Sequence, residues 1–189
     1  MLPKSLKTLQ IYGTFDSTLH PGCIPPNVKS LYLSHTLPIE KGVLPDSIRD
    51  LTFGYSFNGP VEYYPSNLEV LSFYGYNQPF LPGSLPKSLR VLQLGTLHFG
   101  QLAPNSLPEN LEVLIVTYSK VILDSTILPP SCWKLTVTDF SQSIKCGDLS
   151  THIRHLNLGV DVQFEKDSFK NMNLETLKIG DRYCKFKRE

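Results

Sequence analysis

Residues Pro79 to Gly95, PFLPGSLPKSLRVLQLG, contain one complete repeating unit of this chain. The unit begins with a Pro-Gly turn and a Leu-Pro pair, and then places Leu89, Leu92 and Leu94 at spacings of three and two. The alternation of apolar residues around position 93 is typical of a β-strand whose leucines share one face. The stretch therefore predicts a proline-bent turn that leads into one short strand.

The same unit recurs along the whole chain. Seven copies carry a proline at the equivalent position, and these prolines are 20–22 residues apart: Pro3, Pro25, Pro45, Pro65, Pro86, Pro108 and Pro129. Two further copies, near Leu149 and Lys170, lack the proline but keep the apolar triplet. The middle of the triplet is leucine in every copy: Leu9, Leu31, Leu51, Leu71, Leu92, Leu114, Leu135, Leu156 and Leu177. A fixed period of this length indicates a solenoid whose turns stack on one another.

These repeats predict a β-rich solenoid of the leucine-rich-repeat kind, with about nine turns of 20–22 residues. One strand per turn would form a parallel concave sheet. The return segments are rich in proline and glycine, so we expect extended or 3₁₀ backbone with little helix. Small polar residues before each strand, such as Ser47 and Ser88, are expected to bond nearby backbone in tight turns. Residues 1–180 form a single array in this interpretation, and residues 181–189 form a basic C-terminal tail.

A less regular aromatic column follows the strands: Phe15, Phe57, Tyr76, Phe99, Phe140, Phe164 and Tyr183. We expect these rings to fill the wide end of the core, with an aromatic ligand platform as the alternative. Asn58 and Asn77 predict an asparagine ladder that is displaced and partial. No terminal cap is evident, so we expect each end to be covered by a partner, a second copy or further chain.

The columns resemble a leucine-rich repeat, and the unit is more closely similar to the FNIP repeat, named for Phe-Asn-Ile-Pro. Residues 57–60, FNGP, nearly repeat that motif, and residues 76–89 carry the fuller pattern. The resemblance covers residues 2–180 and implies a solenoid for protein–protein contact. The family is known mainly from amoebae and the large DNA viruses that infect them, where an N-terminal F-box often recruits ubiquitin-ligase machinery. Because the repeats begin at residue 2, we expect no F-box in this chain.

Composition and charge exclude several classes of function. The formal net charge of +1 creates no field that favours nucleic acid or a membrane surface. No apolar run approaches the roughly 20 residues of a membrane span. The four cysteines show no C-x-x-C spacing, and neither a signal peptide nor an N-x-S/T sequon is present. We therefore predict an intracellular, cytoplasmic location, which is the host cytoplasm if the protein is viral.

Residues that could support catalysis or metal binding do not converge in the sequence. His152 and His155 have H-x-x-H spacing, but neither has an acidic or thiol partner at a fixed distance. We interpret the pair as ordinary surface residues, with a metal half-site as the alternative. The chain has no G-x-S-x-G motif, glycine-rich phosphate loop or calcium loop. The sequence therefore predicts a protein that is not an enzyme and has no cofactor, metal or small-molecule substrate.

Outward-facing strand residues form the predicted binding surface, because exposed aromatic and aliphatic side chains in a row are typical of interfaces. The residues expected to contact a partner are Tyr12, Tyr32, Tyr74, Val70, Val91, Gln93, Val113 and Ile115. We predict a non-enzymatic scaffold that contacts an unidentified protein or a second copy through the concave sheet. The alternatives are the substrate-recognition part of an F-box-type ubiquitin-ligase adaptor, a solubilising β-surface, and a fragmentary repeat without a selected partner.

Overall fold

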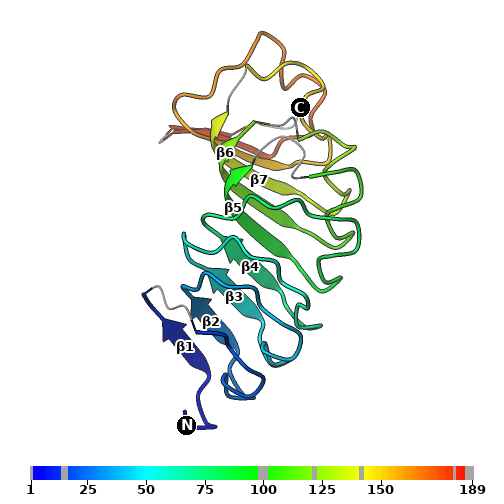
Figure 1. Cartoon of the computed structure of the whole chain (residues 1–189). Helices are drawn as coiled ribbons and strands as arrows, with labels where there is room; N and C mark the ends of the chain where they lie inside the picture. The colour runs from blue at the N-terminus through cyan, green and yellow to red at the C-terminus, as the bar shows by residue number, and fades with distance from the viewer. Residues whose placement is uncertain are drawn as a thin grey trace.

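The computed structural model of the chain is an elongated stack of short strands that follow one another in chain order (Figure 1). It describes residues 2–13, 17–97, 102–120, 123–140, 143–180 and 182–185, with residues 96, 97 and 182–185 as backbone only. Phe15 and Phe99 of the predicted aromatic column, and the side chain of Tyr183, lie outside the described part. The described residues contain strands, turns and extended connections but no helix.

Ten strands form one sheet in the order β1 to β10. Their bounds are Thr8–Ile11 (β1), Ser30–Leu33 (β2), Asp50–Phe53 (β3), Val70–Phe73 (β4), Val91–Leu97 (β5), Val113–Ser119 (β6), Lys134–Phe140 (β7), His155–Leu158 (β8), Thr176–Ile179 (β9) and Arg182–Lys185 (β10). Strands β1 to β9 are all parallel, each paired with the strand of the next repeat. The predicted solenoid with a parallel sheet and little helix is confirmed.

The register of the sheet follows the leucine column. Leu92 lies opposite Leu71 on one side and opposite Leu114 on the other, and the same pairing continues from Leu9 to Leu177. From β2 onward these leucines are buried. A slip of one residue would turn every leucine toward solvent, so burial of this column determines the register.

A proline turn leads into most of the strands. The carbonyl oxygen of Pro86 accepts a hydrogen bond from the amide of Leu89 at 3.1 Å, and the same i to i+3 bond joins Pro25 to Val28 and Pro108 to Leu111. Proline is the first residue of each of these turns, where its carbonyl oxygen is used and its missing N–H is not needed. The turn therefore delivers the first apolar residue of each triplet into the core.

The small polar residues before the strands bond a different repeat from the one that we expected. The hydroxyl of Ser88 donates to the carbonyl oxygen of Leu68 at 2.7 Å, and Ser47 and Ser131 make equivalent bonds one turn back. The side-chain amide of Asn110 likewise donates to the carbonyl oxygen of Lys87. The prediction of local bonds within each turn was wrong, because these side chains point along the solenoid axis and satisfy the preceding repeat.

Aromatic rings fill one end of the core in the middle repeats. Phe57 stacks on Phe53 at 4.1 Å between centroids, and Tyr76 stacks on Phe73 at 4.3 Å. Phe140 is also buried, so the predicted spine is present at these repeats. Phe164 is 44% exposed and is therefore not part of it. Among the described residues, the predicted partial asparagine ladder shows one rung, in which the backbone N–H of Asn77 donates to Oδ1 of Asn58 at 2.9 Å.

The C-terminal end of the sheet contains a strand that sequence analysis did not foresee. Residues 182–185, within the predicted basic tail, form β10, which runs antiparallel to β9. The edge of β9 is therefore paired by the chain's own next segment, contrary to the expectation that no cap is present at this end. The boundary of the array at residue 180 stays a prediction.

Candidate functional site

The outward-facing residues of the parallel strands form the surface that we call the outer face. They alternate with the buried leucines and align across the sheet in strict register: Gln10, Tyr32, Thr52, Ser72, Gln93, Ile115, Thr136, Asn157 and Lys178. Because every repeat contributes one residue to this column, neighbouring side chains come from positions about 21 residues apart in sequence. The outward residues of successive repeats therefore lie next to one another and form one continuous surface.

The apolar residues predicted to bind a partner lie side by side in the middle of the outer face. Val70 is opposite Val91, and Val91 is opposite Val113, so the three valines form one row across β4, β5 and β6. Gln93 is opposite Ile115 in the neighbouring row. All five side chains are half-buried. The structure therefore brings these predicted residues together, while their contact with a partner stays a prediction.

Four tyrosines gather at the carboxyl ends of β1 to β4. The rings of Tyr12 and Tyr32 are 4.9 Å apart between centroids, and those of Tyr55 and Tyr74 are 5.1 Å apart. Tyr12 is 67% exposed and Tyr55 is 76% exposed. We call these four side chains the tyrosine patch. The structure places the three predicted tyrosines in two separate aromatic pairs.

Tyr55 is the member of the patch that sequence reasoning missed. It follows β3 in a turn and so falls outside the alternating strand positions from which the binding residues were chosen. Its signal in the sequence is the pair Gly54-Tyr55, where a large aromatic residue directly follows a glycine at the strand end. Only the stacking on Tyr74 from the next repeat shows that it belongs to the same surface.

Charged residues directly precede most of the strands and form a row at the opposite end of the sheet. Arg49 pairs with Glu69, Arg90 pairs with Glu112 at 3.0 Å, and Arg154 lies 3.7 Å from Glu175. These are exposed or half-exposed ion pairs between adjacent repeats, and such pairs contribute little to stability, about 0–1 kcal/mol each. They make this border of the outer face polar, in contrast to the tyrosine patch.

His152 and His155 do not converge on a metal site. His152 is exposed, whereas Nδ1 of His155 lies 2.8 Å from the Thr176 hydroxyl and its ring meets Trp133 edge-on. Within the described ranges, no group of three or more His, Cys, Asp or Glu side chains could hold a metal ion. The described part of the chain includes no helix that is long and apolar enough to span a bilayer.

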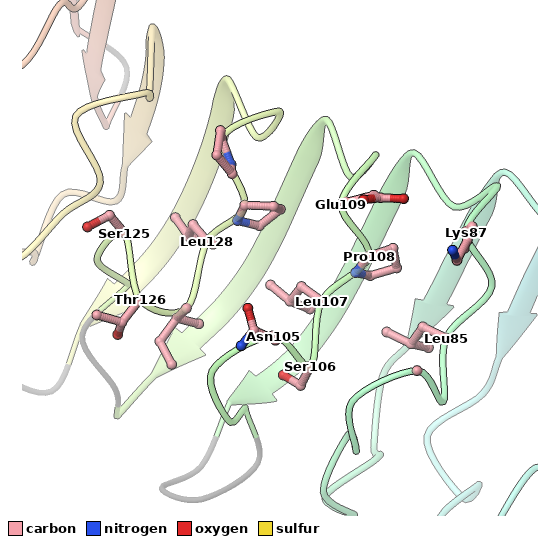
Figure 2. A pocket seen from close by; sticks show the side chains of 14 residues that line it. Leu85, Lys87, Asn105, Ser106, Leu107, Pro108, Glu109, Ser125, Thr126 and Leu128 are labelled. Atoms are coloured by element: carbon pink, nitrogen blue, oxygen red, sulfur yellow. The ribbon is translucent and has the colours of Figure 1, made fainter.

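A shallow groove of about 390 Å³ crosses the return segments of the fifth to seventh repeats (Figure 2). Its lining includes Lys87 of the fifth repeat, Asn105, Ser106 and Glu109 of the sixth, and Thr126 of the seventh. Ser106 is buried, and its hydroxyl has no hydrogen-bond partner among the described residues. One unpaired hydroxyl does not define a ligand chemistry, so the groove is a weaker candidate than the outer face.

Ionisable groups with shifted pKa values belong to the core or to the return side. Burial raises the pKa of the Tyr64 phenol, with a further contribution from nearby Tyr76, whose own pKa burial also raises. Burial likewise raises the pKa of the Cys132 thiol from 9.0 to about 12. On the return side, the carboxylate of Asp46 raises the pKa of Tyr63 and accepts a hydrogen bond from its hydroxyl. These shifts describe structural environments rather than a reactive centre.

Comparisons with known proteins agree with this geometry. The probable serine/threonine-protein kinase fnkE of Dictyostelium discoideum is 32% identical to 74% of this chain, which spans only 10% of the kinase's length. The crystal structure of CroV588, a circular leucine-rich-repeat protein, superposes with a TM-score of 0.67 at 23% identity; the match covers 95% of this chain and 34% of CroV588. This second likeness shows the fold alone.

The repeat itself is matched by a family model. The model of the FNIP repeat matches residues 1–36, 35–63 and 57–97, which together cover about half of the 189 residues. The matched segments contain the first five strands, each preceded by its proline turn. The chain therefore belongs to the FNIP repeat family.

Proposed function

We propose that this protein is a non-enzymatic scaffold that binds another protein through the outer face of its sheet. The observation that carries the proposal is the combination of the valine row, Ile115 and the tyrosine patch on one continuous surface. Aromatic side chains supply much of the binding energy at protein interfaces, and aliphatic rows gain free energy when a partner covers them. The charged border supplies a polar rim.

A cellular setting in reducing conditions is part of this proposal. Cys23 and Cys146 are exposed free thiols, and Cys132 is a buried free thiol. Free exposed cysteines are typical of intracellular proteins, since oxidising compartments tend to convert them to disulfides. The predicted alternative role, as the substrate-recognition part of an F-box-type ubiquitin-ligase adaptor, stays a prediction.

The first test is affinity capture with an outer-face variant. Ile115→Lys places a charge beside the valine row, and we expect it to lose the proteins that the unchanged chain captures from a cell extract. Captured proteins are identified by mass spectrometry, and one of them is then titrated in purified form. Desolvation of an unpaired ammonium group at the interface should weaken binding at least about tenfold.

The matched control for this test is Leu81→Lys. Leu81 is 64% exposed and lies in the return segment between β4 and β5, away from the outer face. Both variants should keep the circular dichroism spectrum and melting temperature of the unchanged protein. If Ile115→Lys retains full binding, or if Leu81→Lys loses it equally, the outer face is not the binding surface.

A further inference from the structure

We infer that Phe186, in the segment that follows β10, docks into an apolar groove at the C-terminal end of the core and closes that end of the solenoid. The groove lies on the return side and not on the outer face, so this inference goes beyond the proposed function and does not depend on it. Residues 186–189 lie outside the described part of the chain, whereas the groove and the backbone of β10 lie within it.

The docking site, which we call the C-terminal groove, has a volume of about 570 Å³ and is formed by residues between β8 and β9. Its apolar lining consists of Phe164, Phe169, Met172 and Leu174. The rings of Phe164 and Phe169 are 5.3 Å apart between centroids. The other apolar members pack against the core but stay partly exposed. The groove is therefore an uncovered part of the core itself.

Phe164 shows that this end of the core lacks the cover that the earlier repeats have. It forms a parallel bridge with Ile144, the equivalent residue one repeat earlier, and Phe80 forms the same kind of bridge with Leu102. Those three residues are at most 6% exposed, whereas Phe164 is 44% exposed. Among the described residues, no later return segment lies beyond Phe164. Cover for the last repeat therefore has to come from the segment after β10 or from another molecule.

The strand β10 brings the chain to the edge of the C-terminal groove. It runs antiparallel to β9, and its register ends with Lys185 opposite Thr176. Thr176 is two residues from Leu174, which lines the groove. Consecutive Cα atoms are 3.8 Å apart, so the next residue, Phe186, starts beside this lining. No long linker is needed for it to reach the site.

The alternation of a strand also gives Phe186 a suitable direction. Position 184 is opposite Leu177, which is buried, and residues directly opposite each other share one face of a sheet. Alternate positions along a strand share that face as well. A strand that continued to residue 186 would therefore turn Phe186 toward the core.

The chemistry of the groove selects the phenylalanine from the residues after β10. The others are charged: Lys187, Arg188 and Glu189. The charged residues of the lining are two acidic and two basic, and so leave no net charge: Glu165, Asp167, Lys166 and Lys170. An aromatic ring gains free energy in proportion to the apolar area that the groove removes from water. Phe186 is the residue of this segment that gains by entering.

Tethering favours Phe186 over a second copy of the chain as the occupant. Docking of Phe186 is intramolecular, and a short linker gives an effective concentration of about millimolar or more. A second copy would first have to lose its translational and rotational freedom. The end of the core is therefore closed within one molecule.

The test is methionine methyl NMR, because the chain has two methionines and one of them lines the groove. The protein is labelled with [methyl-¹³C]methionine and protonated phenylalanine in a deuterated background, and Met172→Leu distinguishes the Met172 signal from that of Met1. We expect a nuclear Overhauser effect between the Met172 methyl group and a phenylalanine ring that disappears in Phe186→Leu. The same variant should shift the Met172 methyl signal by several linewidths, because leucine keeps an apolar side chain but has no ring current.

Hydrogen exchange provides a second measurement. Phe186→Ala should accelerate amide exchange in β9 and in residues 164–174, and should lower the melting temperature, because the end of the core loses its cover. Lys187→Ala is the matched control, since it changes the neighbouring residue without removing an apolar side chain. It should leave the Met172 signal, the exchange rates and the melting temperature unchanged.

Three results would overturn the inference. The first is a Met172 methyl signal and ring contacts that are identical in the unchanged protein and in Phe186→Leu. The second is an equal effect of Lys187→Ala. The third is a Met172 signal that changes on dilution together with the sedimentation coefficient, which would show that a second copy covers the groove.

Discussion

Cys132 occupies a position that Leu, Ile or Val fills in the other eight repeats. Its side chain is fully buried, and its thiol lies 3.7 Å from the carbonyl oxygen of Lys134. Sulfur can replace a branched apolar side chain here because free cysteine behaves as a small hydrophobe. The substitution adds something that a leucine lacks, namely a group that can ionise inside the core.

The pH dependence of stability should therefore contain a contribution from Cys132. Burial raises the pKa of this thiol from 9.0 to about 12, so the folded state resists the ionisation that the unfolded chain undergoes near pH 9. The contribution is complete below pH 9 and is lost as the pH rises from 9 toward 12. The difference in free energy of unfolding between the unchanged protein and Cys132→Val should therefore change with pH. It should be about 2 kcal/mol less favourable to the unchanged protein at pH 10.5 than at pH 7.

Urea unfolding of both proteins with a reducing agent at the two pH values measures this difference. Comparison with Cys132→Val is required because the raised pKa values of Tyr64 and Tyr76 lower the stability of both proteins above pH 10 in the same way. A pH-independent difference between the two proteins would show that the thiol at position 132 is not buried in the folded state.

At the scale of the element, each repeat is held to its neighbour by more than the sheet. Besides the backbone bonds between strands, Ser47, Ser88 and Ser131 each donate a side-chain hydrogen bond to a carbonyl oxygen one turn earlier. The polar residue that closes one turn thus also satisfies a backbone group of the preceding turn, which would otherwise be left without a partner inside the stack. The turn sequence therefore serves the contact between repeats as well as the local bend.

Removing one of these side-chain bonds should have a measurable cost. Ser88→Ala deletes the donor to the Leu68 carbonyl oxygen, and we expect a loss of about 1 kcal/mol in the free energy of unfolding, measured by urea denaturation. Ser5 occupies the same position in the first repeat, where the described chain offers no earlier repeat to bond. Ser5→Ala should therefore cost much less, and equal losses for the two variants would contradict the role assigned to Ser88.

At the scale of the whole molecule, stability depends on position along the stack. A solenoid is stabilised by contacts between successive turns, so an inner repeat has two neighbours and a terminal repeat has one. The burial of the leucine column reflects this difference: Leu92 is fully buried, whereas Leu9 in β1 is only half-buried. The two ends also differ, because β9 is paired by β10 while the outer edge of β1 has no partner strand among the described residues.

The same truncation should therefore have unequal effects in the middle and at the end of the array. Leu92→Ala should cost about 2–5 kcal/mol through the cavity that it leaves between β4 and β6, as seen by urea unfolding. Leu9→Ala should cost clearly less. Hydrogen exchange should show the loss in Leu92→Ala spreading to the strands on both sides. An unchanged urea midpoint for Leu92→Ala would contradict the observed register.

The sheet and its register could be predicted from sequence because the information is periodic. Nine copies of one apolar pattern, from Leu9 to Leu177, specify which side of each strand is buried, and burial leaves a single register. The strand β10 could not be foreseen, because it breaks the period and consists of only four residues, which show no repeat pattern. Phe164 was wrongly predicted to lie in the buried aromatic column for a related reason. The identity of one aromatic residue does not show whether its neighbours will bury it.

By itself, then, the sequence determined the period, the fold class, the inward columns and the list of residues that can face outward. Tertiary structure decided which side chains meet: Ser88 reaches back to Leu68, Tyr55 stacks on Tyr74, and β10 pairs with β9. The physical reason is that hydrophobic burial is recorded in each repeat, whereas contacts between repeats depend on where the stack brings residues about 20 positions apart. The candidate binding surface is made entirely of such contacts.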